Sequence, residues 1–230
     1  MTEHPILFSA SMVRAILDGS KTQTRRVINP QPRAETYRFM RAIHALWLPV
    51  WSDAATHNGD EIRCPYGQPG DRLWVRETFH VGVVTASLLR GPNFADVKYK
   101  AGGSHSAELA DEAQFVQAIR FGLPKPKWRP CIHMPRWACR LTPDVLDVRA
   151  QRVQDISEED IYAEGIVPIG SGCGKLGKAN GNTSYSTARS LFWQLWDSIN
   201  GKKPGRAWAD NPWVWAVTFR RREPDTEGGE

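Results

Sequence analysis

The chain has little of what would mark a secreted, membrane-spanning or zinc-binding protein. It has four cysteines in 230 residues, and none shows the paired C-x(2–4)-C spacing of structural zinc sites. No apolar run approaches the roughly 20 residues that a membrane-spanning helix needs. Residues 1–5 lack the basic and apolar regions of a secretory signal. We therefore expect a cytoplasmic protein with reduced thiols, no metal, no cofactor and no membrane contact.

Acidic residues are missing from one long stretch, residues 120–140. Its basic residues are Arg120, Lys125, Lys127, Arg129, Arg136 and Arg140, and Trp128 and Trp137 are interleaved with them. Cations and flat aromatic rings together suit phosphate binding and base stacking, so this stretch indicates contact with RNA. The alternative is a solvated basic loop whose tryptophans pack inward. The net charge of the whole chain is +5.

The densest polar segment follows the first expected strand and helix. Residues 6–9 are typical of a short strand, and residues 11–18 repeat apolar side chains at helical spacing. Gly19 can adopt the left-handed conformation that ends a helix. The next residues bring a lysine, two threonines and two arginines close together in the sequence. Such a polar set directly after an apolar lead-in is a candidate functional site.

The clearest strand is expected at residues 72–79, where apolar and polar side chains alternate. Because alternate residues of a strand share one face, Glu77 lies on the same face as Leu73 and Val75. A buried carboxylate is costly unless it is paired or changes its pKa. We expect Lys21 to be the partner of Glu77.

The other elements show no regular alternation of strand and helix, which disfavours a doubly wound parallel sheet. Strands are expected at 95–100, 137–141, 145–153 and 213–219, and helices at 108–119, 157–165 and 187–199. Residues 101–107 and 120–136 are expected to be irregular. The pattern predicts a single α+β domain over residues 1–222 with a Gly-rich insertion at about 166–185. The acidic residues 223–230 are expected to form a disordered tail.

Two further patterns are weak. Residues 172–179 nearly match a phosphate-binding loop, but Ala179 stands where a hydroxyl residue would hold magnesium. We therefore expect a flexible loop there. Cys131, His133 and Cys139 lack the spacing of metal ligands, and we expect the two cysteines to be buried thiols.

The motif Gly19-x-Lys21-x-x-Thr24-x-Arg26 resembles the G-x-K-x-x-[E/T]-x-R signature of the ASCH family. Further similarities, to the longer ASCH proteins common in phages and prophages, lie at residues 70–77, 195–200 and 211–213. The resemblance covers most of residues 5–221. It implies a PUA-like fold, which is a small partly closed β-barrel of short mixed strands with flanking α-helices.

The resemblance also implies an activity. Some ASCH proteins are amidohydrolases that remove acyl groups from N4-acylcytidine, with a Lys, a Thr three positions later and a Glu on a later strand as the proposed catalytic residues. These roles carry over to Lys21, Thr24 and Glu77, because amide hydrolysis needs a nucleophile, a base and a group that stabilises developing charge. The substrate-binding residues that we expect beside them are Phe8, Ser9 and Arg26.

Several alternatives remain open at this point. Lys21 is either the base or a cation facing the oxyanion, since desolvation lowers the pKa of a lysine and a nearby carboxylate raises it. The attacking group is either Thr24 or an activated water, and the substrate is either a free modified nucleoside or RNA. The competing functions are an RNA- or nucleotide-binding module without catalysis and a ribonuclease. A purely structural Lys21–Glu77 pair, with Thr24 in a turn, is the remaining interpretation.

Overall fold

The computed structural model describes residues 1–31, 63–86, 92–169 and 187–222. The backbone of two short hairpins is also described: β3 (Arg38–Arg41) with β4 (Trp47–Val50), and β10 (Val167–Ile169) with β11 (Cys173–Lys175). Apart from these hairpin strands, the predictions for the phosphate-loop-like segment, the Gly-rich insertion and the acidic tail lie outside the described residues.

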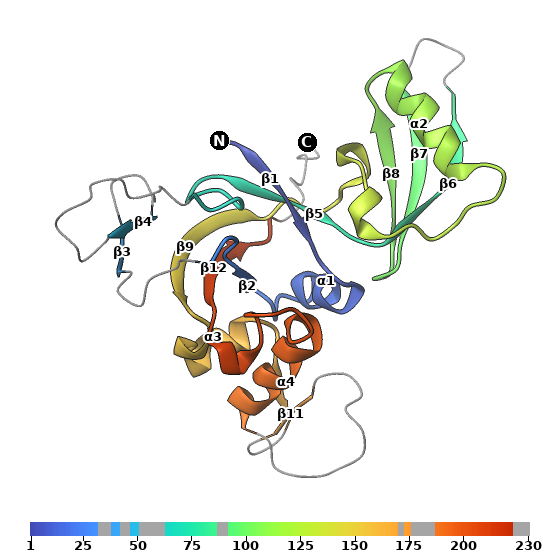
Figure 1. Cartoon of the computed structure of the whole chain (residues 1–230). Helices are drawn as coiled ribbons and strands as arrows, with labels where there is room; N and C mark the ends of the chain where they lie inside the picture. The colour runs from blue at the N-terminus through green and yellow to red at the C-terminus, as the bar shows by residue number, and fades with distance from the viewer. Residues whose placement is uncertain are drawn as a thin grey trace, which may run out of the picture.

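A curved five-stranded sheet forms the larger lobe (Figure 1). Its strands are β1 (Glu3–Leu7), β5 (Arg72–Arg76), β9 (Asp144–Arg152), β12 (Trp213–Arg220) and β2 (Gln23–Val27), in that spatial order. The β1–β5 pair is parallel and the other neighbours are antiparallel. The sheet is not a closed barrel. Instead, the Arg26 side chain links its two edge strands, donating from Nη2 to the Leu7 carbonyl oxygen at 2.8 Å.

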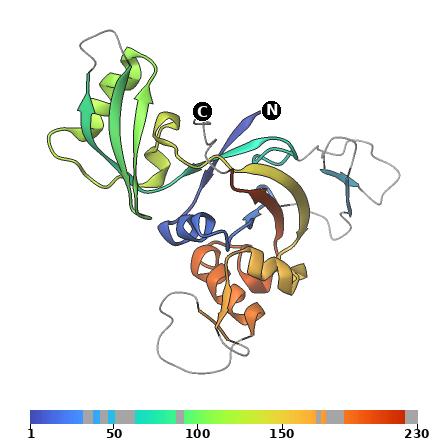
Figure 2. The same cartoon turned by 180° about the vertical axis from the view of Figure 1, so that it is seen from behind.

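Three helices accompany this sheet: α1 (Ala10–Leu17), α3 (Glu158–Ala163) and α4 (Ala188–Asn200). Helix α1 buries Val13 and Ile16 in the core beneath the sheet, because these two residues are three positions apart on one face. Helices α3 and α4 enclose a second apolar cluster at the other end of β12, built around Phe192 and Trp196. Figure 2 shows them on the side of the sheet away from the smaller lobe.

The smaller lobe is an antiparallel sheet of β6 (Phe79–Thr85), β7 (Asn93–Tyr99) and β8 (Ser104–Leu109), with α2 (Glu112–Gly122) packed against it (Figures 1 and 2). It has its own buried core, in which alternate strand residues face Ala118 of α2. The chain enters the lobe directly from β5, with only Glu77 and Thr78 between β5 and β6. The described residues therefore form an α+β structure with two main sheets, and the two lobes have separate apolar clusters.

Most of the long elements predicted from the sequence are confirmed. The strands predicted at 145–153 and 213–219 and the helices at 157–165 and 187–199 correspond to β9, β12, α3 and α4. Capping explains the accuracy of the helix starts, since Ser157 and Thr187 accept backbone hydrogen bonds from Asp160 and Ser190. Each cap fixes the first turn from local sequence alone.

Other assignments are wrong. The segment predicted as loop and early helix after Ala101 contains strand β8, and α2 begins only at Glu112, after the cap Asp111. Residues 137–141 do not form a strand. A 3-10 turn at Arg136–Ala138 takes their place, because Trp137 donates its indole N–H to Gln117 on α2. Contacts with the smaller lobe override the local strand propensity there.

Candidate functional site

Lys21 lies between α1 and β2, and its side chain is buried, with only 2% of the residue exposed. Its ammonium nitrogen donates to the Gln23 carbonyl oxygen at 2.8 Å, to the Glu164 carbonyl oxygen at 2.9 Å and to Glu164 Oε2 at 2.7 Å. These three contacts match the three N–H donors of a protonated lysine. Burial lowers the pKa of Lys21 from its usual 10.5, while the charge and hydrogen bond of Glu164 act in the opposite direction.

The neighbouring strand β2 is polar and nevertheless buried, because α3 supplies it with carboxylates. Arg25 Nη2 forms an ion pair with Asp160 at 2.6 Å, and Arg25 Nη1 lies 3.2 Å from Glu164 Oε1. The Gln23 amide donates to Asp160 as well, at 2.9 Å. Asp160 and Glu164 are four residues apart, so they face the same side of the helix. Burial raises the pKa of Asp160, but the Gln23 hydrogen bond and the arginine charges outweigh it and lower that pKa overall.

Thr24 is in the middle of β2 rather than in a turn, and 1% of it is exposed. It pairs with Val217 of β12. Its hydroxyl oxygen accepts a hydrogen bond from Arg26 Nη1 at 2.9 Å. The Arg26 guanidinium also lies over the Phe8 ring, 5.1 Å from its centroid. Arg26 therefore connects the Thr24 hydroxyl to the end of β1.

Glu77 occupies the junction between β5 and β6, and its predicted burial is confirmed, since 1% of it is exposed. The guanidinium of Arg140 holds both carboxylate oxygens, with Nε 2.8 Å from Oε1 and Nη2 3.0 Å from Oε2. Arg140 is positioned in turn by the Gly102 carbonyl oxygen and by the Tyr99 ring. Burial raises the pKa of Glu77, and the hydrogen bonds and charge of Arg140 partly offset that rise.

The expected ion pair between Lys21 and Glu77 is therefore wrong. Each residue has a different partner, Glu164 for Lys21 and Arg140 for Glu77. The planar guanidinium of Arg140 meets both oxygens of Glu77 at once, which a lysine ammonium does not do. Helix α3 meanwhile brings Glu164 to Lys21.

Phe8 connects these otherwise separate pairs. Its backbone N–H donates to the Arg76 carbonyl oxygen at 3.1 Å, one residue before Glu77. Its ring lies 5.9 Å from Lys21 Nζ, in addition to its contact with Arg26. The adjacent Ser9 caps α1, accepting from the Met12 backbone N–H at 3.3 Å. The predicted residues thus lie around the end of β1, although the side chains predicted to be catalytic do not bond to one another directly.

The sequence did not reveal the two residues that pair with Lys21 and Glu77, which are Glu164 and Arg140. Glu164 was included in a helix whose acidic start indicated only a cap, and Arg140 was assigned to the basic stretch. A local signal existed for Glu164, because its spacing of four from Asp160 places two acids on one helix face. Arg140 lies 63 residues from Glu77 in the chain, and no local pattern joins them.

Three of the six basic residues in the stretch 120–140 make contacts within the fold. Arg140 holds Glu77, Arg136 forms an ion pair with Glu3 at 2.7 Å, and Arg129 lies over the Phe121 ring. For Arg120, Lys125 and Lys127, no side-chain ion pair is found with the residues that the structure describes. Of the six basic residues in this stretch, Arg120, Lys125 and Lys127 are therefore the ones that remain available for the predicted RNA contact.

The cysteines near this stretch differ from the expectation in one respect. Cys139 is buried, and its thiol lies 3.4 Å and 3.2 Å from the carbonyl oxygens of Val75 and Leu141. Burial raises the pKa of the Cys139 thiol. Cys131 is only partly buried, so the prediction of two buried thiols is half right. Within the described ranges there is no cluster of three or more His, Cys, Asp or Glu residues that could hold a metal ion.

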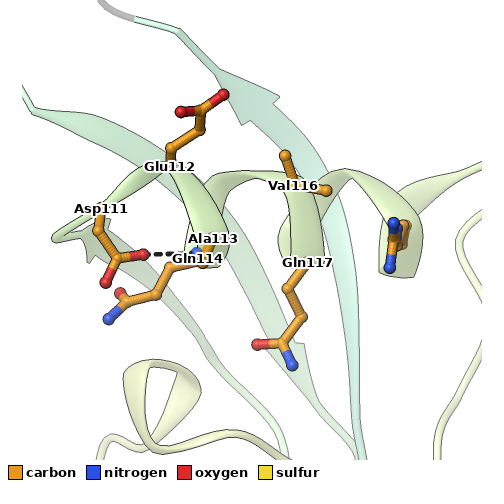
Figure 3. A pocket seen from close by; sticks show the side chains of 7 residues that line it. Asp111, Glu112, Ala113, Gln114, Val116 and Gln117 are labelled. Carbon is orange, nitrogen blue, oxygen red and sulfur yellow. Dashed lines mark hydrogen bonds between the residues drawn. The ribbon is translucent and has the colours of Figure 1, made fainter.

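A hollow of about 640 Å³ lies against α2 (Figure 3). It is lined by Asp111, Glu112, Ala113, Gln114, Val116, Gln117 and Arg120. Asp111 accepts a hydrogen bond from the Gln114 backbone N–H at 2.8 Å, so the helix start is already capped. One helix and its cap supply the whole lining, and no predicted catalytic or substrate-binding residue belongs to it. We assign this hollow no function.

Comparison with known proteins does not assign the chain to a family. No protein-family model, no curated protein and no solved structure matches this chain. The ASCH resemblance therefore stays a prediction. None of the described helices is long and apolar enough to cross a membrane.

Proposed function

We propose that this chain is a metal-independent amidohydrolase with a PUA-like, ASCH-type fold. It cleaves the N4-acyl amide of N4-acylcytidine-type nucleosides and releases cytidine and a carboxylic acid. The observation that carries the proposal is the hydrogen bond from Arg26 Nη1 to the Thr24 hydroxyl oxygen, at 2.9 Å inside the protein. The three free cysteines of the described residues fit the cytoplasmic location that we propose with it.

This hydrogen bond prepares a hydroxyl group for attack. Because Thr24 accepts from Arg26, its own proton remains available for transfer to a base. The guanidinium stays charged, and a positive charge next to the oxygen stabilises the alkoxide that forms as the proton leaves. In a buried site this electrostatic stabilisation is stronger than in water.

Lys21 supplies the base in this proposal. Burial lowers the pKa of Lys21, which increases the fraction of neutral amine near neutral pH. A neutral amine has two N–H donors and one lone pair, so one of the three present contacts of Lys21 opens when it loses its proton. The free lone pair is then available for the Thr24 proton.

The reaction proceeds in two balanced steps. Thr24 Oγ1 attacks the acyl carbon, its proton passes to Lys21, and the C–N4 bond breaks as N4 takes that proton back. Water then hydrolyses the Thr24 ester, giving the carboxylic acid and restoring the hydroxyl. Glu77 accepts the proton of this water, since burial raises its pKa and makes the carboxylate a stronger base. That proton then returns to Thr24 Oγ1 as the ester C–O bond breaks, so that Glu77 is again a carboxylate.

The shape of the main sheet supports the fold part of the proposal. Its five strands are mixed in direction, three of them have only five residues, and the sheet is curved and flanked by helices (Figure 1). Arg26, the last residue of the motif, bridges the two edge strands through the Leu7 carbonyl oxygen. Arg26 thus has a structural as well as a catalytic role in the partly closed barrel that we propose.

A second candidate is a nucleotide-binding module without catalysis. The specific observation in its favour is that Lys21 already makes three hydrogen bonds and that only 2% of the residue is exposed. A permanently charged lysine in this position acts as a structural ion pair with Glu164 and cannot accept the Thr24 proton. The same residues would then shape a binding site without transferring protons.

The two candidates are separated by incubating the purified protein with N4-acetylcytidine and following the products by chromatography. The amidohydrolase proposal predicts catalytic release of cytidine that continues with EDTA present. Calorimetric titration with cytidine is run in parallel. Binding of cytidine without any release from N4-acetylcytidine identifies the binding module, and cleavage of single-stranded RNA in the same preparation would identify a ribonuclease instead.

A further inference from the structure

The smaller lobe carries a second surface, built on the segment that leaves α2 and returns beside β6 (Figure 1). The start of this segment is fixed by the Leu123 backbone N–H, which donates to the Ile119 carbonyl oxygen at 3.0 Å. Its end is fixed by two backbone hydrogen bonds between Arg129 and Phe79, at 2.7 Å and 3.2 Å. The residues between these anchors are thus held in place on the lobe.

Trp128 is the central side chain of this surface, and 48% of it is exposed. The His80 ring packs edge-on against the Trp128 ring, with centroids 4.8 Å apart. Lys100 Nζ lies 5.4 Å from the centroid of the Trp128 ring. A tryptophan that is positioned by its neighbours and still half exposed is a platform on which another flat ring can stack.

Exposed lysines surround this platform. They are Lys98, Lys100, Lys125 and Lys127. Lys98 is the cross-strand partner of His80, so it lies at the same end of the sheet as Trp128. Among the residues that the structure describes, these four lysines have no ion pair with an acid. Two acids share this sheet face: Asp96 lies two residues before Lys98 on β7, and Glu108 lies opposite Phe94, further along the sheet.

We propose that this surface binds single-stranded nucleic acid. A base stacks on Trp128, and Lys98, Lys100, Lys125 and Lys127 contact the adjacent phosphates. Unpaired cations around an exposed aromatic ring match the alternation of phosphates and bases along a single strand. An acidic polypeptide would satisfy the lysines, but its acidic side chains offer no flat ring to stack on Trp128, whereas every nucleotide carries one. The surface shares no residue with the Lys21 and Thr24 site, so each proposal stands or fails separately.

The contribution of Trp128 is tested by fluorescence anisotropy with a labelled single-stranded RNA of about 12 nucleotides, long enough to cover one such site. We expect Trp128→Ala to weaken binding about tenfold and Trp128→Phe to retain most of the affinity, because stacking needs only an aromatic face. Trp193→Ala is the matched control, since Trp193 is 47% exposed on α4 in the other lobe. Thermal melts verify that each variant is folded.

The contribution of the lysines is tested by repeating the titration at several salt concentrations. Removing two phosphate contacts flattens the slope of log K against log salt by about 1.4 for a single strand. We expect this change for the Lys125→Ala/Lys127→Ala variant and none for Lys202→Ala/Lys203→Ala, which removes two exposed lysines elsewhere. Equal effects of the Trp128 and Trp193 variants, or an unchanged slope, overturn the proposal. The proposal is also overturned if poly-glutamate displaces the labelled RNA as well as unlabelled RNA does. That result would assign the surface to acidic polypeptides.

Discussion

Thr24→Ala is expected to lower kcat for N4-acetylcytidine hydrolysis by about a thousandfold or more, because it removes the attacking oxygen. The protein should still fold. Thr24 is buried in β2, so the loss of the hydroxyl that Arg26 contacts costs about 1–3 kcal/mol of stability. Arg26 Nη1 keeps one acceptor, the Arg25 carbonyl oxygen at 3.1 Å. Steady-state kinetics and thermal melts measure the two effects separately.

Thr24→Ser is the control for this prediction. It keeps the hydroxyl and loses one methyl group, so we expect measurable turnover and a smaller loss of stability. Lys21→Ala should be as inactive as Thr24→Ala, and the double variant little worse than either, because residues that act as a unit are not additive. If Thr24→Ala folds and hydrolyses at the wild-type rate, the nucleophile is a water activated by Lys21 or Glu77.

The largest effect on stability is expected from Glu164→Ala. This change leaves the buried Lys21 ammonium without its counter-ion and removes one of the two carboxylates that face Arg25. Breaking a buried pair on one side costs about 3–5 kcal/mol. In a chain of this size that corresponds to a decrease in Tm of roughly 10 °C. Differential scanning calorimetry or a melt followed by circular dichroism measures it.

Glu159→Ala is the matched control, because Glu159 is an exposed acid on the same helix. Its Tm should change little. The paired variant Lys21→Met/Glu164→Leu removes both buried charges and should recover much of the lost stability, since the cost arises from the unpaired charge. If the Tm of Glu164→Ala equals that of the Glu159→Ala control, Glu164 does not stabilise the buried Lys21 ammonium.

The local sequence was sufficient to predict those features that depend on alternating side chains or on capping residues within the element itself. The alternation in residues 72–79 correctly placed Glu77 in the interior, although the single strand predicted there is divided into β5 and β6 by Glu77 and Thr78. Capping residues fixed the starts of α3 and α4. Strand β2 was missed because Gln23, Thr24 and Arg25 are polar. Gln23 and Arg25 are satisfied inside the protein by the carboxylates of Asp160 and Glu164, 135–139 positions away in the chain, and Thr24 is satisfied by Arg26.

The partners of the candidate catalytic residues could not be predicted for the same reason. Glu164 is 143 residues from Lys21, and Arg140 is 63 residues from Glu77. A buried charge in a sequence shows that a partner is required, but not which of the 55 acidic and basic side chains supplies it. That choice is made by the packing of α3 on β2 and by the position of residues 136–141 beside β5 and the smaller lobe.

The most direct test of the central claim is the mass of the protein during turnover. Wild-type protein is mixed with N4-acetylcytidine, quenched in acid within the first turnovers, digested and analysed by mass spectrometry. Attack by Thr24 predicts a transient gain of about 42 Da, one acetyl group, on the peptide that contains Thr24, and no gain in Thr24→Ala. Catalytic release of cytidine by a wild-type protein whose Thr24 peptide never gains this mass, in quenches spanning the first turnover, would contradict the account.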